Sequence, residues 1–133
     1  MAKENRLKKN TRILIIAIQQ EIDRNPIKNR KVAVLIKDAG VDRKLLEAGF
    51  KQIFNVTIKK YQIMRRMEFS RQLLDEGRFS IKEIAFKCGY CSQNSYAKAF
   101  KKLYSQTPSD WQNRPENMED DLYPPNQPPH FGL

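Results

Sequence analysis

The feature that most constrains the fold of this chain is an internal repeat with an offset of 50 residues. The segment Phe50–Ile58 (FKQIFNVTI) aligns with Phe100–Pro108 (FKKLYSQTP), and Tyr61 aligns with Trp111. In each copy a helix-forming stretch ends in an aromatic residue, and a threonine then opens the next helix. A repeat of this length indicates a supersecondary unit that is present twice.

Each copy also carries a glycine where two helices would turn. Gly40 and Gly89 align with one residue of slippage, and glycine permits the positive φ that lets consecutive helices meet at a sharp angle. In the second copy Ala85 precedes the glycine by four residues, and its small side chain allows close packing. Ile36 stands at the equivalent place in the first copy, so the packing there must differ. The pattern predicts two helix-turn-helix units.

Apolar residues recur at intervals of three or four nearly throughout, which predicts an all-α fold. Capping residues, glycines and prolines divide the chain into seven expected helices. These run from a cap at Thr11 to Arg24, from about Lys31 to Ala39, from a cap at Asp42 to Phe54, from Thr57 to Glu76, from a cap at Ser80 to an end at Gly89, from a cap at Ser92 to Tyr104, and from Pro108 through Trp111.

The expected domains are two helix-turn-helix subdomains joined by a long linker helix. They comprise a basic arm (1–10), a first subdomain (11–56), the linker helix (57–77), a second subdomain (78–113) and a disordered acidic, Pro-rich tail (114–133). The 19 residues from Ile58 to Glu76 form about 28 Å of helix, close to the ~34 Å of one turn of B-DNA. Such a linker can hold two reading helices about one turn apart on a duplex.

The charge of the chain favours a polyanionic partner. There are 25 Lys and Arg against 15 Asp and Glu, which gives a net charge of +10. The last 20 residues carry one basic and four acidic residues, so the preceding part of the chain has a net charge of +13. This excess attracts nucleic acid, although a basic surface alone is also compatible with simple solubility. Without a membrane-length apolar run or a secretory signal, we expect a cytoplasmic, nucleoid-associated protein.

Helical spacing separates an apolar face from a polar face in each copy. The residues expected in the core are Leu14, Ile15, Ile18 and Ile22 of the first helix, Leu45, Leu46, Phe50, Ile53 and Phe54 of the third, Tyr61, Met64, Met67, Leu73 and Leu74 of the linker, and Tyr96, Phe100, Leu103 and Tyr104 of the sixth. The opposite faces carry Arg, Lys, Gln and Asn, the side chains that pair with base edges in a major groove. A plain solvated face would look similar.

The other expected contacts are electrostatic. The candidates for binding DNA phosphates are Lys51, Lys59, Lys60, Arg65, Arg66, Lys101 and Lys102. Cys88 and Cys91 form a single C-x-x-C pair, and the only histidine, His130, lies in the tail. A zinc site needs four ligands, and a redox motif needs a strand-helix context. We therefore expect no metal, no cofactor and no enzymatic activity.

The region from about Thr11 to Asn113 resembles the DNA-binding domain of the AraC/XylS family of bacterial transcription regulators. The motifs that carry the resemblance are Ile84–Tyr90 (IAFKCGY), Ser95–Lys102 (SYAKAFKK) and Thr107-Pro108. The resemblance implies two recognition helices and transcription activation by contact with RNA polymerase. Carried over by position, the candidates for reading bases are Arg43, Lys44, Glu47 and Ala48 in the third helix and Gln93, Asn94, Ala97 and Lys98 in the sixth.

The sequence departs from the family pattern at the ends of these two helices. The family usually has glycine where Asn55 and Ser105 stand. Asparagine tolerates the left-handed conformation better than serine does, so we expect a looser helix end at Ser105. Glu47 and Ala48 also make the first recognition helix the weaker reader of bases.

The leading hypothesis is a sequence-specific regulator that binds double-stranded DNA in successive major grooves. One chain supplies both reading helices, so a monomer could suffice. A non-specific architectural DNA-binding protein is the alternative, supported by the charge and the weak first reader. A cysteine-based alkyl acceptor, as is fused to such domains in a few regulators, is a third possibility that would depend on Cys88 or Cys91.

Overall fold

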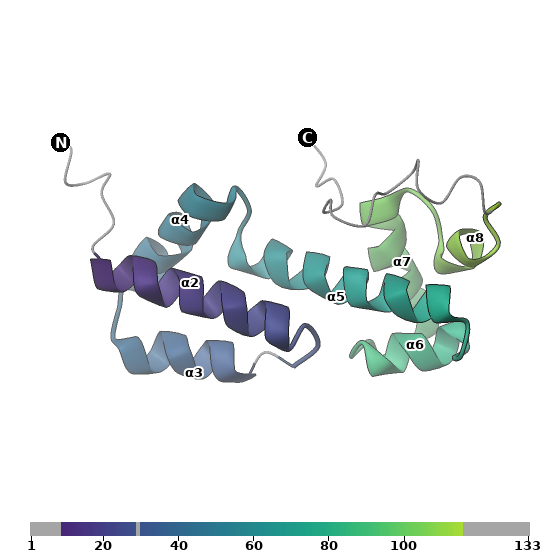
Figure 1. The fold of residues 1–133 in the computed structure, drawn as a ribbon, viewed down its shortest axis with the longest axis horizontal. Coiled ribbons are helices and arrows are strands. Elements are labelled where there is room, and N and C mark those ends of the chain that lie inside the picture. Colours follow the sequence, from purple (N-terminus) through teal and green to yellow (C-terminus); the bar gives the residue numbers. More distant parts are fainter. Residues whose placement is uncertain (1–8, 29, 116–133) are drawn as a thin grey trace. The chain divides into compact units, whose positions relative to one another are not determined.

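The computed structural model describes residues 9–28 and 30–115, which contain seven α-helices and no strand. The expected all-α fold with seven helices is confirmed. The helices are α2 (Lys9–Arg24), α3 (Arg30–Ala39), α4 (Arg43–Phe54), α5 (Ile58–Glu76), α6 (Ile81–Lys87), α7 (Gln93–Tyr104) and α8 (Pro108–Gln112) (Figure 1). Most of the basic arm and of the acidic tail lies outside the described residues. Within the described part, none of the helices is long and apolar enough to cross a membrane.

The chain divides into two compact units, residues 1–65 and 66–133. Unit 1 contains α2, α3, α4 and the first part of α5, whereas unit 2 contains the rest of α5 with α6, α7 and α8. The helices therefore correspond in order. Unit 1 opens with α2 and closes with the start of α5. Unit 2 opens with the end of α5 and closes with α8.

The core of unit 1 forms where α2 packs against α3 and α4. Ile15, Ile18 and Ile22 of α2 have no exposed surface, as the apolar spacing predicted. Leu46 and Phe50 of α4 are fully buried beside them.

The prediction that Leu45 lies in the core of unit 1 is wrong, because this side chain is 46% exposed. Consecutive residues on a helix lie about 100° apart, so only one of the two adjacent leucines can face the core. Leu46 takes that place because Phe50, four residues later, lies on the same side. Ile53 and Phe54 are partly buried.

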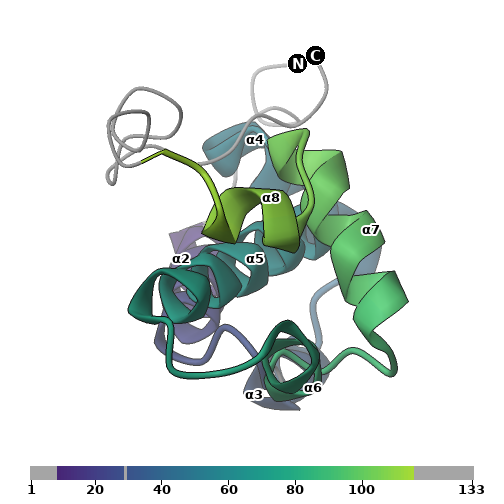
Figure 2. The ribbon, with the colours of Figure 1, turned by 90° about the vertical axis from the view of Figure 1, so that its right-hand side faces the viewer.

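The core of unit 2 forms between the end of α5 and the helices α6, α7 and α8 (Figure 2). All the residues expected there are buried, including Tyr96, Phe100 and Tyr104 of α7. Ala85 on α6 is fully buried, as the small residue before the turn predicted. Its counterpart Ile36 is only partly buried, so the two turns are packed differently.

Three aromatic rings hold α4 against the start of α5 in unit 1. The ring centroids lie 4.7 Å apart for Phe50 and Phe54, 5.6 Å for Phe50 and Tyr61, and 6.0 Å for Phe54 and Tyr61. These are favourable tilted and edge-on arrangements.

The equivalent triad of unit 2 repeats this geometry between α7 and α8. Phe100 and Tyr104 lie 4.6 Å apart, Phe100 and Trp111 6.2 Å, and Tyr104 and Trp111 5.9 Å. Each ring stands 50 residues after its counterpart, and the interplanar angles of the matching pairs differ by only a few degrees. The sequence repeat is therefore a repeat of packing as well.

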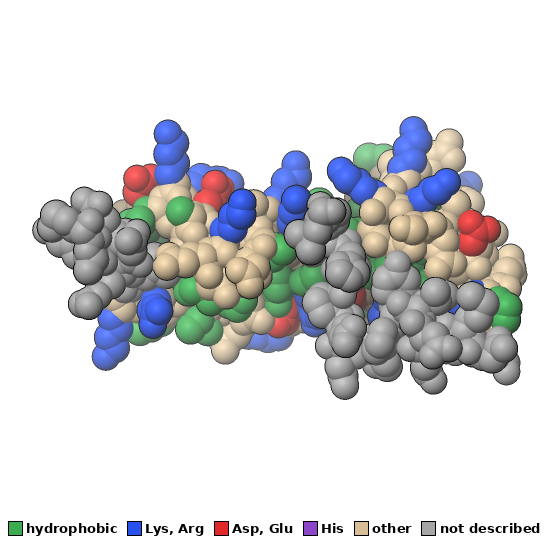
Figure 3. Space-filling view, turned by 90° about the horizontal axis from the view of Figure 1, so that it is seen from above, with side chains coloured by type: hydrophobic (Ala, Val, Ile, Leu, Met, Phe, Trp, Pro, Cys, Tyr) green, Lys and Arg blue, Asp and Glu red, His purple; other side chains and the backbone are tan. Residues whose placement is uncertain are grey.

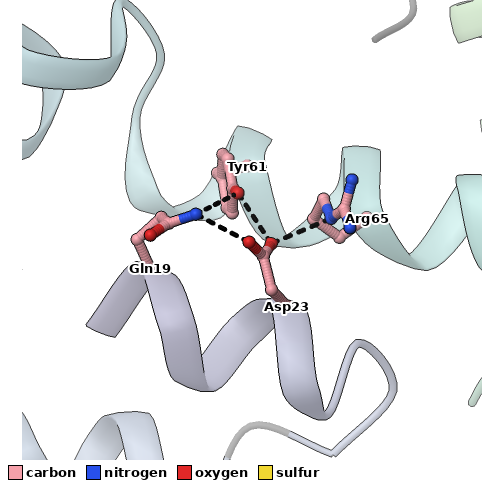
Figure 4. Close-up of polar contacts among 4 residues, drawn as sticks. All are labelled: Gln19, Asp23, Tyr61 and Arg65. Carbon is pink, nitrogen blue, oxygen red and sulfur yellow. Dashed lines mark hydrogen bonds and ion pairs between the residues drawn. The ribbon is translucent and has the colours of Figure 1, made fainter. Parts of the chain in front are cut away.

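A carboxylate ties the opening helix of unit 1 to its closing helix (Figure 4). Tyr61 donates a hydrogen bond of 2.7 Å from its hydroxyl to Asp23, and the Nε of Arg65 lies 2.9 Å from the same carboxylate oxygen. Gln19 donates to Asp23 at 2.6 Å and to the Tyr61 hydroxyl at 3.0 Å. Burial, reinforced by Asp23, raises the pKa of Tyr61 to about 12, so this phenol remains a donor at neutral pH.

Unit 2 contains a matching tie. The indole Nε1 of Trp111 donates to Asp75 at 3.0 Å, and Arg114 lies 3.0 Å from the same oxygen. Arg114 also donates to the Trp111 carbonyl, and its guanidinium lies 4.0 Å from the Trp111 ring centroid. The predicted tail begins at Arg114, but the contacts of this residue belong to the folded part of unit 2.

The ends of the two recognition-type helices are closed alike. Asn55 and Ser105 both adopt the left-handed conformation, with φ of 64° and 62°. Each donates its backbone N–H to the carbonyl four residues before it, at 2.8 Å in both units. The looser end expected at Ser105 is therefore wrong, because the closing hydrogen bond holds serine in a conformation that it otherwise disfavours.

This strain predicts that Ser105→Gly stabilises unit 2. Glycine enters the left-handed region without a Cβ penalty, so we expect the free energy of unfolding to rise by about 0.5–1 kcal/mol after the greater flexibility of unfolded glycine is subtracted. Asn55→Gly is the matched comparison and should give a smaller gain. Urea unfolding followed by the fluorescence of Trp111, the only tryptophan, measures the first variant, and circular dichroism measures both. A gain at Asn55 that equals or exceeds the gain at Ser105 would contradict this account.

The tie in unit 2 predicts that Asp75→Ala lowers stability. The substitution removes an acceptor of the buried indole N–H and one charged partner of Arg114, so we expect a loss of about 1–2 kcal/mol. Glu76→Ala is the control, because this neighbouring carboxylate is also exposed at the end of α5. Equal losses in urea unfolding for the two variants would show that the hydrogen bond to Trp111 contributes nothing.

Candidate nucleic-acid interface

Two glycine turns place one twelve-residue helix at the surface of each unit. Gly40 lies between α3 and α4 with φ of 63°, and Gly89 lies between α6 and α7 with φ of 84°. A Cβ at either glycine would meet no atom within 4 Å. Glycine is therefore favoured at these turns by the left-handed backbone conformation and not by lack of space.

The helices that follow the turns begin at equivalent places. Asp42 caps α4 by accepting the backbone N–H of Lys44 at 3.1 Å, and Ser92 caps α7 by accepting that of Ser95 at 3.1 Å. The helices therefore start at Arg43 and Gln93, which are 50 residues apart. Both expected starts are confirmed. Each helix buries one side in its own unit and leaves its first two turns largely exposed.

The exposed side of α4 carries all four of the residues expected to read bases in unit 1. Arg43, Lys44, Glu47 and Ala48 are exposed, and Lys51 follows them one turn later. The Nε of Arg43 lies 3.0 Å from Glu47. This ion pair offsets the charge of Arg43 on the reading side, and the spacing of four residues between opposite charges could have predicted it.

The exposed side of α7 differs in charge. Gln93, Asn94 and Lys98 are exposed, Ala97 is partly covered, and α7 contains no acidic residue. The Ser95 hydroxyl takes part in the N-cap of α7, since it donates a hydrogen bond to the backbone carbonyl of Ser92 at 3.0 Å. The positive charge of α7, which includes the exposed Lys101 and Lys102, is thus not offset by any carboxylate on the same helix.

The residues expected to bind phosphates fall into two groups. Lys51, Lys59 and Lys60 in unit 1, and the lysines of α7 in unit 2, are exposed at the surface. Arg65 pairs with Asp23, and Arg66 is partly buried with its guanidinium 5.9 Å from the Tyr90 ring centroid. Lys and Arg are also prominent among the charged side chains of the face drawn in Figure 3.

The two cysteines occupy different environments. Cys88 is fully buried, and burial raises the pKa of its thiol to about 11. Cys91 is exposed in the turn before α7. Among the described residues, no group of three or more His, Cys, Asp or Glu side chains is placed to hold a metal ion. The ties through Asp23 and Asp75 were missed by sequence reasoning, because their partners lie more than 35 positions away.

Comparisons with known proteins agree with this geometry. A family model described as "Helix-turn-helix domain" matches residues 35–114, which is more than half of the chain. The "Probable transcriptional regulator LumQ" of Photobacterium leiognathi is 30% identical over 79% of this chain and 42% of its own length. A "Putative AraC-like transcription regulator" of Streptomyces lividans is 31% identical over 71% of this chain and 31% of its own length. The chain thus spans less than half the length of these relatives.

A solved structure supports the fold separately. A "DNA-binding transcriptional dual regulator from Escherichia coli K-12" superposes with a TM-score of 0.62, at 24% identity, over 77% of this chain and 97% of that one. At that identity the likeness concerns the fold alone. The identification of the family rests on the match of its model to residues 35–114. The chain belongs to the AraC-type helix-turn-helix family of DNA-binding transcription regulators.

Proposed function

We propose that this protein is a sequence-specific transcription regulator that places α4 and α7 in successive major grooves of double-stranded DNA. The observation that carries the proposal is the pair of equivalently capped helices, each with exposed side chains that can pair with base edges. The candidates are Arg43, Lys44, Glu47 and Ala48 on α4, and Gln93, Asn94, Ala97 and Lys98 on α7. Arg and Lys suit guanine, Gln and Asn suit adenine, and Glu suits cytosine.

The remaining basic residues would position the protein on the duplex. Lys51, Lys59, Lys60, Lys101 and Lys102 are exposed and suit phosphate contacts. Arg65 and Arg66 would contribute only if they leave their present partners. A helix of 19 residues measures about 28 Å, so we expect two half-sites separated by about one turn of DNA, or ~10 base pairs.

Selection of binding sites from random duplexes tests this function directly. Because α4 and α7 carry different side chains, the enriched site should be asymmetric and about 20 base pairs long. Recovery of no enriched motif would refute sequence-specific recognition. It would favour the second candidate function, a non-specific architectural DNA-binding protein, which the net charge of +10 and the ion pair on α4 support.

We further propose that the protein acts on DNA as a monomer and reaches RNA polymerase from its site. The family resemblance supports contact with the polymerase, and the two reading helices on one chain support the monomer. In vitro transcription from a promoter that carries the selected site would measure the effect of the protein on RNA synthesis. Equilibrium sedimentation of the complex would measure its stoichiometry.

The division between base and phosphate contacts predicts different outcomes for two lysine substitutions. Lys98→Ala should cost about 1–3 kcal/mol on the selected site and much less on random DNA. Lys60→Ala should weaken binding to both alike and lower the slope of log K against log salt by about one. Fluorescence anisotropy across a salt series measures both. Equal losses on selected and random duplexes for both variants would contradict the assignment.

The ion pair on α4 predicts that Glu47→Gln increases non-specific affinity. Removing the carboxylate frees Arg43, and an exposed pair of this kind is worth about 0.2–1 kcal/mol. Binding to random duplex should therefore strengthen by up to about fivefold, while the preference for the selected site falls. Glu76→Gln makes the same change of charge at an exposed site away from α4. An equal gain from that control would show that only net charge matters.

A further inference from the structure

Unit 2 exposes two aromatic residues in and just before α6, and two cations lie against one of them. Phe86 on α6 is 52% exposed, and Phe79, just before the helix, is partly exposed. The Nζ of Lys87 lies 4.4 Å from the Phe79 ring centroid, and the guanidinium carbon of Arg78 lies 5.6 Å from it. We call Arg78, Phe79, Phe86 and Lys87 the α6 patch.

The α6 patch is not explained by the core or by the reading helix. The side of α6 that packs inward consists of Ile84, Ala85 and Cys88, all fully buried. Phe86 therefore points away from the interior of unit 2. An exposed Phe86 and a Phe79 ring contacted by two cations suit a partner that combines acidic and apolar side chains, because the cations attract its charge and the rings cover its apolar groups.

The chain itself contains a segment with this chemistry. Residues 116–123 read ENMEDDLY, with four carboxylates interleaved with Met118, Leu122 and Tyr123. They follow directly on Pro115, at the end of the folded part of unit 2. The eight residues from Glu116 to Tyr123 can extend to roughly 28 Å, about the length of α5. Attachment to the same chain gives the segment a local concentration of about a millimolar.

Other basic surfaces are less suited to this segment. α7 carries Lys98, Lys101 and Lys102, but its aromatic residues are buried, so it offers charge without an exposed ring. α4 exposes Leu45, but Glu47 offsets the charge of Arg43 there. We propose that residues 116–123 dock on the α6 patch of the same chain.

The test compares backbone amide NMR spectra of full-length proteins. The variant Glu119→Gln, Asp120→Asn, Asp121→Asn changes only residues after Pro115, so the folded part stays intact. It should shift the amide signals of residues 79–87 and leave those of α7 unchanged. Raising the salt concentration in the unmodified protein should produce the same shifts, because the attraction is electrostatic.

Phe86→Ser provides the reciprocal test from the folded side. It should change the signals of residues 116–123, whereas Ile13→Ser, which removes a similarly exposed apolar side chain from unit 1, should not. Shifts confined to α7 would place the segment on the reading helix, and shifts that depend on protein concentration would place it on a second copy. Either result, or no shift at all, would overturn the proposal.

Discussion

Each unit depends on one carboxylate that joins its opening helix to its closing helix. Aromatic stacking alone tolerates small rotations of the rings, whereas a hydrogen bond fixes direction. Asp23 holds Tyr61, and Asp75 holds Trp111, by accepting the polar hydrogen of each ring. An arginine that follows the ring by three or four residues pairs with the same oxygen. The turn-bearing helices are thereby enclosed between two helices that are tied to each other.

The same scaffold carries two chemically different surfaces. Because the interior contacts repeat so closely, the differences between the units are concentrated on the solvent side of α4 and α7. The exposed side of α4 presents Arg43 paired with Glu47, whereas the exposed side of α7 presents lysines and that helix contains no acidic residue. A residue that repels phosphates lowers affinity for every sequence, and the loss is recovered only where a base compensates. The ion pair between Arg43 and Glu47 lowers the net positive charge of the exposed side of α4, whereas α7 keeps the full charge of its lysines.

Much of the fold could be predicted from the sequence because its signals are local. Asp42, Ser80, Ser92 and Thr107 cap helices within three residues of themselves, and Gly40 and Gly89 mark the turns. The burial of Leu46 in place of Leu45 also had a local signal, because only Leu46 has a large apolar residue, Phe50, four positions later. The partners of Asp23 and Asp75 had no such signal, since nothing near a carboxylate specifies a ring more than 35 residues away.

The candidate interface was predictable to a similar extent. The starts and exposed sides of α4 and α7 follow from caps and spacing. The four-residue spacing of Arg43 and Glu47 indicates an ion pair on one helix face, but this pair was not predicted from the sequence. The engagement of Arg65 and Arg66 within the folded units required the structure, because it depends on the position of Asp23 and of the Tyr90 ring. The assignment of individual side chains to bases and phosphates stays a prediction.

The burial pattern of α5 has a consequence for how this protein can be divided. Every third residue from Ile58 to Leu73 is buried, an interval shorter than the helical turn, so the buried stripe moves around the helix by about 60° at each step. The beginning of α5 completes one core, and its end starts the next. A fragment that ends before α5 would lack Tyr61, which packs against Phe50 and Phe54. A fragment that begins after α5 would lack Asp75, which accepts the hydrogen bond from Trp111. The two copies therefore meet within one helix, whose nineteen residues contribute to both cores.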